Sequence, residues 1–220
     1  IDLPKIRRPA PVVVDGSGFG FDISATGQPL TNINNAVMVF EREKFDLAFD
    51  TFTQRVIGPD GREWTDAHTL ELTLRLQREI GLSRIAPQTV GDAVVTYARR
   101  NRKNTLVEFF EGLSWDRTPR IEGFLSRAFG AADNEYTRAV SRNFMRAMPA
   151  RGYTPGAKND TMVVLEGNQG IQKSSGLQVI ASAPWFAEAA ESPHSKDFFQ
   201  ALIGKLIVEI AEMDAFSRAE

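Results

Sequence analysis

An unbroken apolar run that leads directly into a glycine-containing loop constrains the fold of this chain more than any other feature. The run is Met162-Val163-Val164-Leu165, and Gly167 and Gly170 follow it. A short continuous apolar run bounded by turn residues is typical of a strand buried on both faces, as in a parallel sheet. Residues 177 to 181 continue as an apolar, helix-like segment. We therefore predict a strand, a loop and a helix, which begin an α/β core.

The loop has the spacing of a phosphate-binding loop. In the pattern G-x-x-x-x-G-K-[ST], glycines let backbone N–H groups close around phosphate oxygens, the lysine reaches the β- and γ-phosphates, and the hydroxyl binds Mg²⁺. Gly167, Lys173 and Ser174 stand at the required spacing. The expected ATP-binding residues are Gly167, Asn168, Gln169, Gly170, Ile171, Gln172, Lys173, Ser174 and Ser175.

One position of the loop departs from this pattern, because Gln172 stands where the second glycine belongs. Its Cβ would lie near the β-phosphate and is expected to reduce nucleotide affinity. The pattern without this glycine occurs by chance in on the order of 10% of chains of this length, so an ordinary strand-to-helix turn is the alternative. The position of the loop, after an expected strand and at the start of an expected helix, favours phosphate binding.

A second apolar run, within residues 205 to 212, ends in carboxylates. We expect it to be a strand that delivers Glu209, with Glu212 close behind. An ATPase needs such a carboxylate to hold Mg²⁺ through water and to polarise the attacking water. The alternative is a pair of solvated carboxylates at the start of a helix. We interpret Lys173, Glu209 and Glu212 as catalytic and Ser174 and Glu209 as metal ligands, and which glutamate is the catalytic one stays open.

The rest of the chain predicts three parts: an extended, Pro- and Gly-rich arm over residues 1–30, a small module over 31–103, and a helical lead-in with the N-terminal part of an ATPase domain over 104–220. The expected fold class is α/β, a P-loop NTPase core incomplete at its C-terminus, preceded by a small, mostly helical α+β module. Both ends of the chain read as cut. The elements expected before residue 160 are helices at 32–43, 65–80, 88–100, from Thr105, 121–129 and 134–148, and a strand at 47–57.

Composition narrows the classes of function. The chain has no Cys and two His, which excludes disulfides and thiolate metal sites and argues against a His-rich metal site. No apolar run approaches the ~20 residues of a membrane helix, and no signal-peptide pattern opens the chain, so we expect a cytoplasmic protein without a membrane partner. The formal net charge of -2 provides no general attraction for nucleic acid, so a DNA contact would need a local patch.

Two local features are candidates for such a contact. Arg99, Arg100, Arg102 and Lys103 form a basic run that would bind the phosphates of a DNA strand. The alternative, which we favour, is a helix end whose cations complement its dipole. Trp115 is a candidate for stacking on a base, although an anchor between two helices is the interpretation that we favour.

Several motifs together resemble the virulence-associated protein E family in order and spacing. They are NTLVEFFEGLSWDRTPRI from Asn104, YTRAVSR from Tyr136, PGAKND from Pro155, VLEGNQGIQKS from Val164 and GKLIVEIAEMD from Gly204. Lys173 and Ser174 fall on the family's phosphate and Mg²⁺ positions, and Glu209 and Glu212 fall on its acidic element. Gln172 departs from the glycine pattern, and Arg117 stands where the family predicts glycine.

The resemblance implies a phage or prophage ATPase similar to superfamily 3 helicases, often fused behind a primase-polymerase domain. It implies ATP hydrolysis with Mg²⁺ that drives the unwinding of single-stranded or forked DNA in replication, by a ring that is a hexamer. The family's arginine finger would lie beyond Glu220, so we expect residues 1–220 alone to hydrolyse ATP poorly or not at all. The alternatives are a DNA-binding or scaffolding module with a degenerate P-loop and a P-loop kinase, for which we find no acceptor site.

Overall fold

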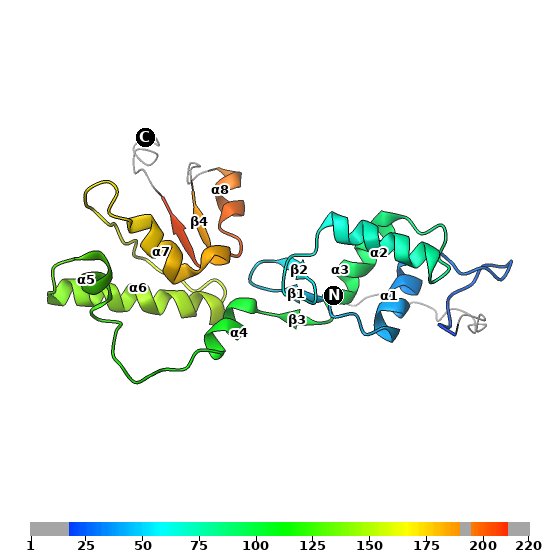
Figure 1. Cartoon of the computed structure of the whole chain (residues 1–220), viewed down its shortest axis with the longest axis horizontal. Helices are drawn as coiled ribbons and strands as arrows, with labels where there is room; N and C mark the ends of the chain where they lie inside the picture. The colour runs from blue at the N-terminus through cyan, green and yellow to red at the C-terminus, as the bar shows by residue number, and fades with distance from the viewer. Residues whose placement is uncertain (1–17, 190–194, 211–220) are drawn as a thin grey trace. The chain divides into compact units, whose positions relative to one another are not determined.

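The computed structural model describes residues 18–189 and 195–210, and these divide into two compact units (Figure 1). Unit 1 contains the chain up to Asp50 together with Arg55–Lys103. Unit 2 contains Thr51–Gln54 and the chain from Asn104 onward. None of the helices in the described ranges combines the length and the apolar character that crossing a bilayer requires.

Unit 1 consists of three helices and a small sheet. Its elements, in order, are α1 (Ile33–Arg42), β1 (Ala48–Asp50), β2 (Arg55–Ile57), α2 (Asp66–Arg78), α3 (Pro87–Ala98) and β3 (Arg102–Lys103). The sheet has the order β2-β1-β3, with β1 antiparallel to β2 and parallel to β3. The single strand expected over residues 47–57 is wrong, because the chain reverses between β1 and β2. Gln54, in the left-handed conformation at φ +58°, makes this turn possible without a glycine.

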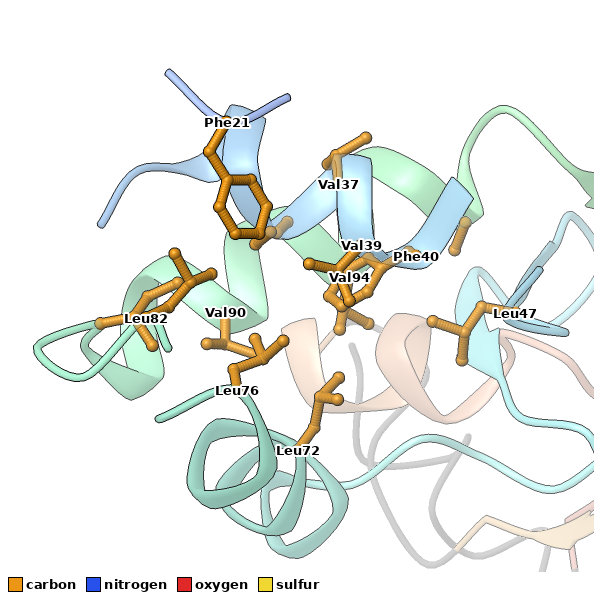
Figure 2. Packing of buried hydrophobic residues seen from close by; sticks show 14 residues of the cluster. Phe21, Val37, Val39, Phe40, Leu47, Leu72, Leu76, Leu82, Val90 and Val94 are labelled. Carbon is orange, nitrogen blue, oxygen red and sulfur yellow. The ribbon is translucent and has the colours of Figure 1, made fainter. Parts of the chain in front are cut away.

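Apolar side chains from all three helices form the core of unit 1 (Figure 2). Phe40 of α1, Leu76 of α2 and Val90 of α3 are at most 1% exposed. Helix ends follow local signals: Asn32 caps α1 by accepting the N–H of Asn35, and Gly81, at φ +88°, lies just past α2. The helices of this unit are therefore amphipathic segments whose apolar faces meet in one core.

Phe19 and Phe21 attach the described part of the expected arm over residues 1–30 to this core, so that part is not a free arm. Phe21 is fully buried against the helices (Figure 2). The buried amide of Asn35 accepts from the N–H of Asp22 at 2.8 Å and donates to the carbonyls of Asp22 and Leu30 at 2.9 and 2.8 Å. Proline and glycine signalled the irregular backbone, but this side-chain bridge decides that the segment is held in place.

Unit 2 is a mixed helix and sheet unit. Its elements are α4 (Thr105–Glu111), α5 (Phe124–Phe129), α6 (Glu135–Tyr153), α7 (Lys173–Ala181), the 3₁₀ turn η1 (Ala183–Trp185), β4 (Phe186–Glu188), α8 (Lys196–Ala201) and β5 (Ile207–Glu209). Strands β4 and β5 are parallel, with Phe186 opposite Ile207 and Glu188 opposite Glu209. Asn104 and Asn134 cap α4 and α6.

Residues 162–165 do not form the buried strand that their apolar character predicts. The described residues include no strand that pairs with them, and Met162 and Val164 are 59% and 51% exposed. The reason is that a strand exists only where a neighbour accepts and donates its backbone hydrogen bonds. An apolar run alone indicates that a segment can be buried, not that a partner strand lies beside it.

Candidate functional site

The loop between residue 165 and α7 places two residues in the left-handed backbone region. Gly170 has φ +83° and Gln172 has φ +61°. Glycine adopts this conformation freely, whereas a residue with a Cβ does so at a cost of about 1–2 kcal/mol. Gln172 is the N-cap of α7, and its carbonyl accepts the N–H of Gly176 at 3.0 Å. Gln172 thus adopts the conformation for which glycine is suited at this position of the phosphate-loop pattern.

The side chain of Lys173 closes this loop. Its Nζ donates to the carbonyl oxygens of Gly167 and Asn168 at 3.0 and 3.1 Å. A Cβ on Gly167 would lie 3.0 Å from Ile171 Cδ1 and 4.0 Å from Lys173 Nζ, so a larger residue at 167 would require the Ile171 side chain to shift. The ammonium group is therefore held at the mouth of the glycine loop, where the pattern requires a cation.

Ser174 and Glu209, which are 35 residues apart, meet in the folded chain. The Ser174 hydroxyl donates to Glu209 Oε1 at 2.7 Å and so joins the first turn of α7 to the end of β5. The other carboxylate oxygen, Glu209 Oε2, is buried and has no hydrogen-bond partner among the described residues. Leaving such an acceptor unsatisfied typically costs about 1–3 kcal/mol. Glu212, the second expected acidic residue, lies outside the described residues.

The oxygen ligands available at this point fit a magnesium ion. A serine hydroxyl and one carboxylate are oxygen ligands, and Mg²⁺ is commonly held by one or two carboxylates together with water and substrate phosphates. The buried Glu209 Oε2 supplies a lone pair that no described donor uses. Ser174 and Glu209 are therefore the two residues that would hold the ion.

A cavity of about 400 Å³ lies beside this cluster. Its lining includes residues 161–165, the strand β5, Lys173 of α7 and Arg151 of α6. Apolar side chains of α6 and α7, among them Met148 and Leu177, complete the wall. The lysine and the glutamate of the candidate site thus both border one space. Sequence analysis did not find Arg151, because a single arginine in the last turn of a helix carries no signal of its own.

The other expected loop residues, Asn168, Gln169, Gly170, Ile171 and Ser175, are exposed around Lys173. Their backbone leads from residue 166 into the N-terminus of α7, as a phosphate-binding loop requires. Exposure leaves these residues accessible to a ligand in solvent. They do not add another charged group to the Lys173, Ser174 and Glu209 cluster.

The basic run Arg99, Arg100, Arg102 and Lys103 is largely engaged within unit 1. Arg100 forms an ion pair with Glu41, Lys103 lies 3.9 Å from Asp46, and the Arg99 guanidinium lies 5.4 Å from the centre of the Phe49 ring. Helix α3 ends at Ala98, directly before the run. These contacts favour the helix-end interpretation over a free DNA-binding patch.

Trp115 is not the anchor between helices that its sequence position suggested, because it is 73% exposed. Its Nε1 donates to the Thr118 carbonyl at 3.3 Å. Hydrogen bonds from Arg120 to both carboxylate oxygens of Asp116, each 2.7 Å, hold the pKa of that carboxyl well below its usual range. Arg117 has φ +67°, which explains why glycine is suited to this position.

Comparison with known proteins identifies a family for this chain. A search of curated proteins found no match. The family model of the virulence-associated protein E-like domain matches residues 110–220, half of the chain, and this range includes the loop, α7 and β5. The resemblance in the sequence motifs is thereby confirmed: the chain belongs to the virulence-associated protein E-like family.

Proposed function

We propose that the chain binds ATP with Mg²⁺ and is the motor part of a phage-type replication helicase, in which ATP hydrolysis drives DNA unwinding. One observation carries the proposal. The hydroxyl that follows the loop lysine meets a strand-end carboxylate at 2.7 Å, and that carboxylate retains a buried, unsatisfied oxygen. Lysine, hydroxyl and carboxylate are the groups that phosphoryl-transfer sites combine.

Each residue of the cluster would have a distinct role. Lys173 would exchange the carbonyls of Gly167 and Asn168 for β- and γ-phosphate oxygens. Backbone N–H groups of residues 168–173 would surround the phosphates, and the N-terminus of α7 would add its dipole. Ser174 and Glu209 would hold Mg²⁺, which when bound would neutralise charge on the phosphates. Glu209 or Glu212 would polarise the attacking water.

Unwinding requires a DNA partner and a ring of subunits, and both are part of the proposal. Family membership supports single-stranded or forked DNA as the partner and a hexameric ring as the assembly, through the resemblance to superfamily 3 helicases. The basic run before Asn104 is a less favourable place for the DNA, because Arg100 and Lys103 pair with carboxylates and Arg99 lies over the Phe49 ring within unit 1.

A specific observation also supports a second candidate, a DNA-binding or scaffolding module with a degenerate loop. Gln172 carries a side chain where the pattern has glycine, and Lys173 already has two acceptors within the loop. A ligand must displace both carbonyls before it binds the lysine. The competing carbonyls are neutral, however, whereas a phosphate oxygen is charged and forms the stronger hydrogen bond.

Replacement of Lys173 by Ala tests nucleotide binding directly. Loss of a charge-assisted contact of about 2–3 kcal/mol corresponds to roughly 30- to 150-fold weaker binding of a fluorescent ATP analogue with Mg²⁺. Lys158→Ala is the matched control, because Lys158 is a lysine of the same unit whose side chain is 85% exposed and pairs with nearby Asp160. Equal affinities for the wild type and Lys173→Ala would contradict the proposal and favour the degenerate-loop module.

The motor part of the proposal needs a separate measurement. If nucleotide and DNA binding are coupled, single-stranded DNA must change nucleotide affinity, and nucleotide must change DNA affinity by the same factor. This reciprocal titration does not depend on ATP turnover. DNA binding without any effect of nucleotide would identify the scaffolding module instead.

A further inference from the structure

The strand that carries Glu209 has support on one edge. Strand β5 pairs with β4. Residues 206–210, which include β5, also line the cavity together with residues 161–165. Two paired strands of three residues each are marginal in isolation, so their position depends on contacts with the rest of the unit. The position of the Glu209 carboxylate against Ser174 depends on the same contacts.

Arg151, in the last turn of α6, provides one of these contacts. Its Nε donates to the carbonyl of Lys205 at 2.7 Å, and its Nη2 donates to the carbonyl of Leu202 at 3.1 Å. Both carbonyls belong to the connection between α8 and β5. Because a guanidinium presents its donors in a rigid fork, two such bonds restrict both the distance and the direction of this connection.

Two further hydrogen bonds of the connection lie on the side of β4. Lys205 Nζ donates to the carbonyl of Pro184 at 2.9 Å, and the N–H of Leu206 donates to the carbonyl of Trp185 at 2.7 Å. Arg151 therefore ties the connection to α6, whereas Lys205 and Leu206 tie it to η1. Held on both sides, β5 begins at a defined place and ends with Glu209 beside Ser174.

We propose that Arg151 is a positioning residue that acts through the backbone of Leu202 and Lys205 to hold Glu209 at the Ser174 hydroxyl, and so sets the affinity of the site for Mg²⁺. This inference rests on the proposed function. Both hydrogen bonds of Arg151 go to backbone carbonyls, so the proposed role requires no contact of Arg151 with the nucleotide or the ion. Groups that orient the ligands of a metal without binding it typically change metal affinity by about 10- to 100-fold when they are removed.

Magnesium titration of the full chain separates positioning from folding. With Arg151→Ala we expect the Mg²⁺ concentration for half-maximal binding of a fluorescent ATP analogue to rise about tenfold. Affinity for the analogue in EDTA should stay within about twofold of wild type, because the contacts of Lys173 do not involve β5. For Arg151→Lys, the Mg²⁺ concentration for half-maximal binding should lie between those of wild type and Arg151→Ala, since lysine can reach a carbonyl but lacks the rigid fork.

The control is Arg146→Ala, which removes an exposed arginine of the same helix that has no side-chain partner among the described residues. It should leave both titrations unchanged. If Arg151→Ala weakened binding equally with and without Mg²⁺, or changed neither, the positioning role would be overturned. The proposed function fails by a different result, namely unchanged nucleotide affinity in Lys173→Ala.

A second measurement tests the role without any nucleotide. In wild type, Ser174→Ala removes the hydrogen bond to Glu209 and should lower the midpoint of chemical denaturation. If Arg151 holds Glu209 in place, the same substitution should have a smaller effect in the Arg151→Ala background. Additive effects of the two substitutions would show that Arg151 stabilises unit 2 without positioning Glu209.

Discussion

The two units of the chain are held together in different ways. In unit 1, fourteen described residues form one buried cluster, built around large side chains such as Phe21, Phe40 and Leu76 (Figure 2). In unit 2, the corresponding cluster contains Met148, Ala181 and Ile207, with its other apolar members only partly buried. Unit 1 is thus stabilised mainly by apolar burial, and the described residues of unit 2 include fewer buried apolar side chains.

Polar contacts connect the elements of unit 2 at the candidate site. Lys173 holds the loop, Ser174 joins α7 to β5, and Arg151 joins α6 to the segment before β5. Such contacts contribute less stability than a packed core, but they fix the orientation of the groups that they join. A site that must admit a ligand cannot be filled with its own side chains, and the cavity beside Glu209 is consistent with this requirement. The comparison predicts large effects from core substitutions in unit 1 and smaller, more local effects at the site.

The largest effect is expected from Phe40→Ala. Phe40 is fully buried and lies against the rings of Phe45 and Tyr97. Loss of a buried phenylalanine typically costs about 3–5 kcal/mol, which chemical denaturation monitored by circular dichroism measures. The control, Leu70→Ala, removes a side chain that is 53% exposed and should change stability by less than about 1 kcal/mol. Similar losses of stability for the two variants would contradict the description of unit 1 as a packed core.

Substitution of one helical glycine in each unit compares their packing, with expected stability changes of about 1 kcal/mol. A Cβ on Gly176 of α7 would lie 2.8 Å from Phe129, whose ring packs edge-on against Phe124, so Gly176→Ala should destabilise the chain by about 1 kcal/mol. A Cβ on Gly91 of α3 would meet Thr69 at an ordinary 3.8 Å. Gly91→Ala should therefore stabilise the chain by about 0.5–1 kcal/mol through helix propensity.

Denaturation midpoints of these two variants provide the measurement. Opposite signs would confirm that α5 and α7 approach as closely as the structure shows. The same sign for both variants would indicate that the Phe129 ring moves aside without loss, and that packing in unit 2 is looser than described.

The smallest effect is expected from Gln172→Gly. Glycine relieves the left-handed strain of about 1–2 kcal/mol but makes the unfolded chain more flexible, so the net gain in stability should be about 0.5 kcal/mol. Removal of the side chain beside the expected phosphate position should also raise ATP affinity a few-fold, to be measured by nucleotide titration. Gln172→Ala, which retains the Cβ, serves as the control. Equal affinities for the two variants would show that the Cβ does not obstruct the loop.

Sequence reasoning succeeded where the determinants are local. Thr65 begins α2, Gly130 ends α5 in the left-handed conformation, and Lys173 follows its glycine loop into α7. Each of these depends on side-chain or backbone preferences within a few residues of the chain. Family membership could also be inferred from the sequence, because the motifs that carry it are spaced along the chain itself.

Sequence reasoning failed where a distant partner decides the outcome. Residues 162–165 are apolar enough for a buried strand, but no described strand pairs with them. Trp115 is apolar enough for a core, but its turn leaves it exposed. Phe21 lies in a stretch that reads as an arm, but the Asn35 amide and the unit 1 helices enclose it. Burial and strand pairing depend on what approaches from elsewhere in the chain, which local patterns do not record.

The amino-acid sequence alone determined the family, single helix ends such as those at Thr65 and Gly130, and the order of lysine and hydroxyl in the loop, because these depend on neighbouring residues and their spacing. Only the tertiary structure decided that Ser174 meets Glu209 and that Arg151 reaches the segment before β5. The physical reason is that such contacts join groups 35 or more residues apart, and the energy that brings them together comes from packing of whole helices and strands.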